Sequence, residues 1–254
     1  MKLTSLHKYL TTAAVALVLA AGLASFPVLA NEGGPVDHAP INPGDRASLQ
    51  RGARTFVNYC LNCHGAAYMR YSRLTDIGLT EDEIKANLMF ASEKVGETMT
   101  VPLDRADGKA WFGVPPPDLS VEARVRGADW LYTYLRGFYR DSTRPTGWNN
   151  IAFPNVGMPH VLYELQGVQK LEEVKAEGGE GGAEVHHKLV LAKPGQLSTE
   201  EYDHLTADLV NYLVYMAEPA RAARIQMGVV VMFFLVIAFF LTLALKKEYW
   251  KDIH

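Results

Sequence analysis

The sequence has little cysteine and no excess of positive charge, and each shortage excludes a class of protein. Two cysteines among 254 residues are too few for a disulfide framework or for a four-cysteine zinc site. The 25 lysines and arginines are outnumbered by 28 aspartates and glutamates, so the formal net charge of −3 argues against nucleic acid as a partner. The length predicts one ordinary domain with appendages, and no internal repeat is evident.

The two cysteines stand together in the run Cys60-Leu61-Asn62-Cys63-His64. Two thiols separated by two residues suit addition to the two vinyl groups of one porphyrin. A histidine directly after the second thiol then falls under the iron as its proximal ligand. The same cysteine spacing occurs in dithiol redox sites and zinc knuckles, but His64 and the lack of a second cysteine pair favour one covalently attached haem c. Dithiol redox chemistry is the main alternative.

Charged residues are missing from a long stretch near the C-terminus, residues 225–245. About 20 apolar residues in a helix span a hydrocarbon core of roughly 30 Å, so this stretch predicts a transmembrane helix. A helix buried in a soluble core is the alternative. The expected anchor and its short tail occupy residues 221–254. Basic residues lie on both sides of the span: Arg221 and Arg224 before it, and Lys246, Lys247 and Lys251 after it.

The N-terminus has the pattern of a signal peptide over residues 1–30. Two lysines precede an apolar run, and the small residues Val28 and Ala30 are placed for cleavage. An uncleaved anchor helix is the alternative, and both readings predict export. Residues 31–220 are therefore expected to form a periplasmic domain, with the C-terminal tail in the cytoplasm.

Apolar residues at helical spacing dominate the exported part. Two stretches begin with the capping-box pattern, at Thr80 and at Ser198, where a hydroxyl residue is followed three positions later by glutamate. Another helical stretch runs directly into the haem motif. The spacing predicts helices over residues 45–58, 80–90, 121–140 and 198–217.

Between these helices the pattern predicts long loops and one small β element. Residues 99–120, which contain three consecutive prolines, and residues 141–159 show few periodic signals. Residues 161–168 and 188–191 predict two short strands around an acidic, glycine-rich tip at 172–184. The expected fold is a mostly α, cytochrome c-type haem domain with long loops and a small β excursion, plus one C-terminal transmembrane helix.

The second axial ligand of the iron decides between electron transfer and binding of small molecules. A methionine thioether keeps the iron six-coordinate and raises its potential, which suits electron transfer. Most methionines fall on helical faces, beside His64 or in the membrane span, which leaves Met99 and Met158 in loops. Met158 is favoured because Gly157 and Pro159 flank it in a loop able to present one side chain inward. Met99 stays open as the alternative.

Further stretches carry a family resemblance: residues 68–74, 80–83, 116–120, 157–159 and 217–219. The Pro-Pro-Asp-Leu-Ser run and the Ala-Glu-Pro run ahead of the anchor are the specific parts, because ordinary small cytochromes c lack them. On these residues the chain resembles cytochrome c1 of bacterial type, the haem subunit of the cytochrome bc1 complex (ubiquinol–cytochrome c reductase). The resemblance covers almost the whole chain.

The resemblance implies roles for individual residues. It makes Met158 the sixth iron ligand, opposite His64, and pairs Arg124 with a haem propionate. A guanidinium holds a carboxylate bidentately, although a solvated helix charge is the alternative reading of Arg124. Trp130 and Tyr134 are expected to line the haem, and an ordinary aromatic core explains them equally well. His160 is expected at the surface.

The implied function is that of an electron carrier and not of an enzyme on its own. Such a subunit accepts an electron from the Rieske iron–sulfur protein, beside cytochrome b in a dimeric complex, and passes it to a cytochrome c. The acidic tip is a solvated loop or a guide for a basic cytochrome c. A membrane-anchored c-type cytochrome serving another oxidase and a haem-based ligand-binding sensor remain alternatives.

Overall fold

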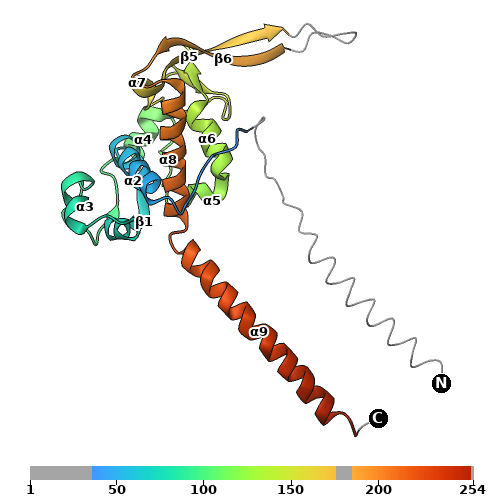
Figure 1. Cartoon of the computed structure of the whole chain (residues 1–254). Coiled ribbons are helices and arrows are strands. Elements are labelled where there is room, and N and C mark those ends of the chain that lie inside the picture. The colour runs from blue at the N-terminus through green and yellow to red at the C-terminus, as the bar shows by residue number, and fades with distance from the viewer. Residues whose placement is uncertain (1–35, 176–184, 253–254) are drawn as a thin grey trace, which may run out of the picture. The chain divides into compact units, whose positions relative to one another are not determined.

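The computed structural model describes residues 36–175 and 185–252, so the signal-peptide prediction and most of the acidic tip lie outside the described residues. Helices dominate, with short strands and one C-terminal apolar helix (Figure 1), which confirms the expected fold class. In chain order the elements are α2 (Arg46–Thr55), the π-helical turn η1 (Phe56–Cys60), β1 (Ala66–Arg70), the 3-10 helix η2 (Tyr71–Ile77), α3 (Glu81–Asn87), β2 (Thr98–Met99), α4 (Arg105–Phe112), α5 (Glu122–Arg126), α6 (Ala128–Arg136), β3 (Phe138–Arg140), β4 (Trp148–Asn150), α7 (Tyr163–Gln166), β5 (Gly167–Lys175), β6 (Val185–Pro194), α8 (Thr199–Ala217) and α9 (Arg221–Tyr249).

The core forms where α2 packs against α8. Both helices begin with side-chain caps: Asp45 accepts from the Ser48 amide, and Ser198 forms the expected capping box with Glu201. Gly52 lets the two backbones approach closely, because a Cβ there would lie 2.1 Å from the carbonyl oxygen of Asp208. This contact fixes the helix that leads into Cys60.

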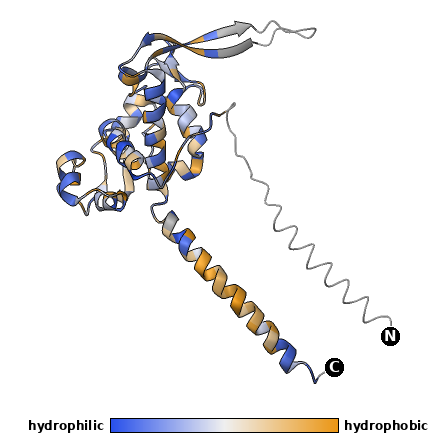
Figure 2. Ribbon diagram, in the orientation of Figure 1, coloured by the Kyte–Doolittle hydropathy of each residue, from blue (hydrophilic) through white to orange (hydrophobic). Residues whose placement is uncertain are grey.

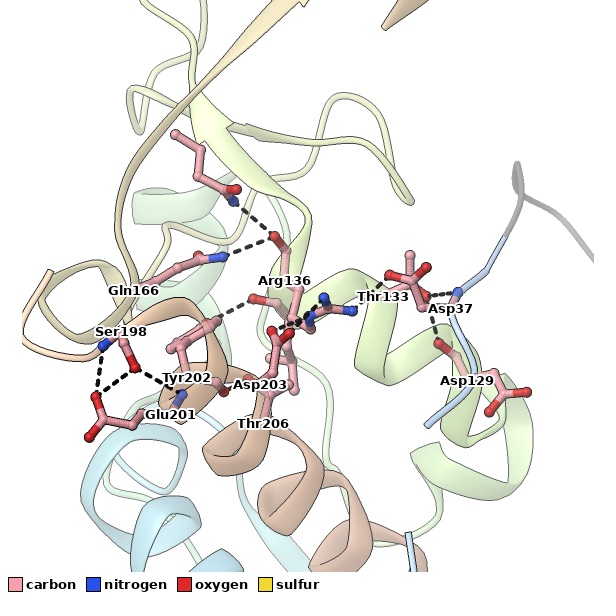
Figure 3. Close-up of polar contacts among 12 residues, drawn as sticks. Asp37, Asp129, Thr133, Arg136, Gln166, Ser198, Glu201, Tyr202, Asp203 and Thr206 are labelled. Atoms are coloured by element: carbon pink, nitrogen blue, oxygen red, sulfur yellow. Dashed lines mark hydrogen bonds and ion pairs between the residues drawn. The ribbon is translucent and has the colours of Figure 1, made fainter. Parts of the chain in front are cut away.

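An arginine on α6 ties three segments of the domain together (Figure 3). Arg136 donates to Asp203 on α8 at 2.6 Å and to Asp37 in the N-terminal segment at 2.7 Å. Its backbone carbonyl accepts from Gln166 of α7 and Gln169 of β5, which hold these two elements against α6. The network fixes α6, one wall of the site described below.

Glycines divide the helix expected over residues 121–140 into two. Gly127 has φ of +85° and separates α5 from α6, because a residue with positive φ cannot continue a right-handed helix. Gly137 then ends α6, and the last three residues of the expected helix form β3. Conversely, α4 lies inside the expected 99–120 loop, capped by Asp104 and ended by Gly113 with φ of +82°.

The β structure consists of antiparallel two-stranded ribbons, β1–β2, β3–β4 and β5–β6. The expected β excursion is present, but its strand boundaries were wrong. Residues 163–166 form α7, and the first strand starts at Gly167 and pairs with Pro194 at the base of the hairpin. The apolar residues of 161–168 suggest a strand, but Leu162 and Leu165 are apolar because they are buried in the core.

The C-terminal helix α9 is apolar over most of its length and polar at its end (Figure 2). Residues 223–249 satisfy the length and composition of a membrane span, and none of the apolar window is buried. Apolar side chains that find no cover within the protein suit lipid. The helix therefore fits the single-pass anchor predicted at residues 225–245.

Candidate functional site

The haem motif and Met158 line one cavity, which encloses about 260 Å³. Trp130 and Tyr134 line the same cavity, and the haem motif contributes Cys60 and His64 to its lining. An adjoining space of about 80 Å³ shares Cys60, His64 and Met158, and adds Cys63 to the lining. The structure thus brings together all the site residues expected from sequence except Arg124.

One ring nitrogen of His64, Nδ1, forms a hydrogen bond within the protein. Nδ1 lies 2.8 Å from the carbonyl oxygen of Pro117, which only accepts, so Nδ1 carries the proton and donates. This bond fixes the ring orientation and leaves Nε2 as the nitrogen with a free lone pair, as in metal-binding histidines. Burial lowers the pKa of His64, which favours the neutral imidazole that binds metals.

The Pro-Pro-Asp-Leu-Ser run holds the backbone that follows the haem motif. The Asp118 carboxylate accepts from the Ala67 amide at 2.7 Å, and the Ser120 hydroxyl accepts from the Tyr68 amide at 3.0 Å. The Leu119 amide donates to the Gly65 carbonyl at 2.8 Å. These bonds hold the Pro117 carbonyl beside His64. The Pro-Pro-Asp-Leu-Ser run therefore orients the His64 ring.

The two thiols have the wrong electrostatics for dithiol redox chemistry. Burial raises the pKa of Cys60 to about 12 and raises that of Cys63 as well. Redox-active Cys-x-x-Cys sites depend instead on a lowered thiol pKa. Within the described residues, no group of three or more His, Cys, Asp or Glu side chains is placed to hold a metal ion.

Met158 reaches the cavity from the loop after β4. Its sulfur accepts a hydrogen bond from the Tyr134 hydroxyl, at an O–S distance of 3.3 Å. Gly157 lets the loop close against α4, because a Cβ there would lie 2.6 Å from the carbonyl oxygen of Phe112. The close approach of α4, a helix that the sequence pattern did not predict, therefore requires a glycine beside Met158.

Met99, the alternative ligand, lies in the hydrophobic core. It is fully buried in β2, and its sulfur is 3.7 Å from the Tyr212 hydroxyl on α8. Met99 is not among the described residues that line the cavity. Of the two loop methionines, only Met158 shares a cavity with His64.

The two arginines of α5 lie differently. Arg124 is exposed and is not among the described residues that line the cavity, whereas Arg126 lines it. The Arg126 guanidinium lies 4.8 Å from the Trp130 ring centroid and 5.7 Å from that of Phe153. Residues two apart on a helix face different directions, so only one of the pair can reach the cavity. Of the two arginines, the structure places Arg126 in this wall of the cavity, and the pairing of Arg124 with a propionate stays a prediction.

His160 is buried, contrary to the surface position expected for it. The residue is 3% exposed, and its ring stacks on Phe138 with centroids 4.8 Å apart and meets Trp148 edge-on with centroids 5.1 Å apart. Burial lowers the pKa of His160 to about 4, so the ring is neutral at pH 7. His160 therefore packs the loop that carries Met158.

Two thiols, an imidazole nitrogen and a thioether around one cavity fit haem c, and together with the helical fold they define a c-type cytochrome. Residues 37–253 match the Cytochrome C1 family, so the chain belongs to that family. Members carry covalently bound haem c, which this chain attaches through Cys60 and Cys63. A cytochrome c1 is an electron-carrier subunit of the bc1 complex and not an enzyme on its own, and the expected resemblance is confirmed.

Relatives cover most of the chain. Cytochrome c1 of Allochromatium vinosum is 48% identical over 91% of this chain and 96% of its own length. A protein of Nitrosomonas europaea named ammonia monooxygenase gamma subunit is 52% identical, covering 86% of this chain and 89% of its own length. The cytochrome b/c1 of Bradyrhizobium diazoefficiens is 28% identical over 85% of this chain and 34% of its own length.

Proposed function

We propose that this chain is the electron-transfer haem subunit of a bc1 complex, with His64 and Met158 as the two axial ligands. The observation that carries the proposal is that both side chains line one cavity with the two thiols. Haem c, when bound, supplies one-electron exchange at its iron. A methionine opposite a histidine suits that role, because it leaves no open position for a substrate.

The remaining site residues shape the environment of the cofactor. We assign the propionate-pairing role, which the family resemblance gave to Arg124, to Arg126, since Arg126 lines the cavity. Glu122 accepts from Arg126 at 3.2 Å and helps to orient the guanidinium. Trp130 and Tyr134 supply aromatic walls that exclude water, which raises the strength of charge interactions inside the site.

The proposed topology places the haem domain in the periplasm and the C-terminus in the cytoplasm. Residues 1–30 act as a signal peptide, residues 31–220 form the exported domain, and residues 221–254 form a single-pass anchor with a short tail. The lysines after the span support a cytoplasmic tail through the positive-inside rule. The name of the Bradyrhizobium relative, cytochrome b/c1, supports cytochrome b as a neighbour.

In the proposed reaction, the chain accepts one electron from the Rieske iron–sulfur protein and passes it to a cytochrome c, within a dimeric complex. The test is a reduced-minus-oxidised spectrum of the detergent-extracted protein together with identification of its co-purifying subunits. We expect a six-coordinate haem c spectrum and co-purification of cytochrome b and the Rieske protein. Isolation of the haem protein alone from mild detergent would favour a cytochrome serving another oxidase. Ready carbon monoxide binding would favour a sensor.

A second candidate follows from the Nitrosomonas relative, whose name places it in an ammonia monooxygenase. With both axial positions filled by His64 and Met158, this chain would serve such an enzyme as an electron carrier and not as its oxygenating centre. The same co-purification separates the two functions. Recovery of monooxygenase subunits in place of cytochrome b would support the second.

A further inference from the structure

We infer that Tyr134 is a positioning residue for Met158, whose hydroxyl hydrogen-bonds the thioether sulfur and sets how strongly that sulfur donates to the haem iron. The inference rests on the proposed function, in which Met158 is an axial ligand. It extends that function by naming a group that tunes the redox potential without touching the iron.

The Tyr134–Met158 contact is a hydrogen bond from a donor to a sulfur that can also bind a metal. The Tyr134 hydroxyl oxygen lies 3.3 Å from Met158 Sδ, and a thioether sulfur accepts but does not donate. The sulfur has two lone pairs, so one is available for a metal while the other accepts the hydrogen bond. Both side chains line the same cavity, which places the contact at the site itself.

The Tyr134 ring is held from several sides, so its hydroxyl is directed before any ligand binds. Trp130 stacks on it with ring centroids 4.9 Å apart and planes 11° apart. Phe138 meets it edge-on at 5.1 Å and 70°. The Tyr134 carbonyl accepts from the Asn150 side-chain amide at 2.7 Å, which pins the backbone. Locked partners of this kind orient metal ligands and tune the metal.

The electronic consequence has a definite sign. An O–H···S bond withdraws electron density from the sulfur and weakens its donation to the iron. Weaker donation destabilises ferric iron more than ferrous iron, because the ferric ion depends more on the ligand's electrons. The hydrogen bond therefore raises the midpoint potential, and its removal lowers the potential.

The test uses the full-length, haem-loaded protein with Tyr134→Phe, which keeps the ring and removes the hydroxyl. We expect a lower midpoint potential and a shifted methionine-to-iron band near the red end of the spectrum, with the band still present. Tyr132→Phe is the matched control: it removes a hydroxyl from the same helix, at a buried position that does not line the cavity. This control is expected to leave the potential and the band unchanged.

A second arm replaces the Tyr134 residue with 3-fluorotyrosine, whose more acidic hydroxyl is a stronger donor in nearly the same shape. The potential is expected to rise, opposite to the Phe variant, which a purely structural role does not produce. This arm also decides the matter if Tyr134→Phe fails to load haem.

Three outcomes overturn the inference. An unchanged potential and band in Tyr134→Phe, or a fall in potential with fluorotyrosine, refutes the role of Tyr134 while leaving Met158 as the ligand. A wild-type protein that lacks the methionine band refutes the ligand assignment itself, and the inference with it.

Discussion

The two sides of the haem cavity are built in different ways. The His64 side consists of neighbours in sequence, the motif from Cys60 onward, held by the single segment from Pro117 to Ser120 through hydrogen bonds. The Met158 side is assembled from α6, β3, β4 and a loop, held mostly by aromatic contacts. The His64 side thus depends on residues close together in the sequence, whereas the Met158 side depends on packing between distant segments.

This difference predicts different responses to mutation. Hydrogen bonds fix the position of individual atoms, so losses on the His64 side act through one or two named groups. Aromatic packing distributes its energy over many contacts, so the Met158 side responds to changes in volume and charge of buried rings. The largest effects are expected where an iron ligand is lost, and the smallest where backbone hydrogen bonds are lost.

Removal of the proximal ligand is expected to have the largest effect. In His64→Ala the iron loses its motif-encoded ligand, so the six-coordinate haem c spectrum should be lost. The measurement is the absorption spectrum of the purified protein per mole of covalent haem. His204→Ala, at an exposed position on α8, serves as the control and should retain the spectrum. A normal spectrum in His64→Ala would contradict the assignment.

Met158→Leu is expected to break the other side while keeping haem attached. Leucine fills a similar volume but has no sulfur, so the methionine-to-iron band should vanish, the potential should fall, and carbon monoxide should bind. Met99→Leu makes the same exchange in the core, where the cost should be below about 1.5 kcal/mol and the band should remain. Loss of the band in Met99→Leu alone would reverse the assignment of the two methionines.

The Met158 side is expected to lose stability in acid through His160. Its pKa is lowered from 6.5 to about 4 by burial, so its stabilising contribution is complete above pH 6.5 and is lost as pH falls toward 4. The difference corresponds to at most about 3 kcal/mol. The free energy of unfolding of His160→Phe, measured between pH 7 and 4, should fall by less than that of the wild type. Equal slopes would show that His160 does not titrate this way.

The smallest effect is expected from loosening the backbone on the His64 side. Asp118→Ala removes the acceptor of the Ala67 and Ser120 amides, which should cost about 1–2 kcal/mol of unfolding free energy. Asp118→Asn keeps one acceptor oxygen and should cost less. Thermal unfolding of the two variants provides the measurement. A larger loss in the asparagine variant would be the contrary result.

Local signals explain which parts of the fold were predictable. The caps at Asp45, Thr80 and Ser198 start helices where the sequence placed them, because a cap bonds an amide three residues away. The break at Gly127 and the helix α4 were missed. The identity of a glycine does not show which backbone conformation it adopts. The residues of α4 have weak helical periodicity and stand just before three consecutive prolines.

The residues of the site likewise divide into those that local sequence predicted and those that depend on tertiary packing. The motif Cys60 to His64 was readable because attachment chemistry demands its spacing within five residues. That Arg126 and not Arg124 lines the cavity was not readable from the sequence, since it depends on how α5 is rotated against the cavity. The burial of His160 depends on rings contributed by β3 and β4, which no neighbouring residue indicates.

The sequence by itself determined the haem attachment, the proximal histidine and the C-terminal apolar span, because each depends on contiguous residues and on a fixed length or spacing. The tertiary structure decided which methionine meets the cavity, which arginine lines it, and that the Tyr134 hydroxyl reaches the sulfur of Met158. These contacts join segments far apart in the chain. Packing selects them from many local possibilities that look alike in sequence.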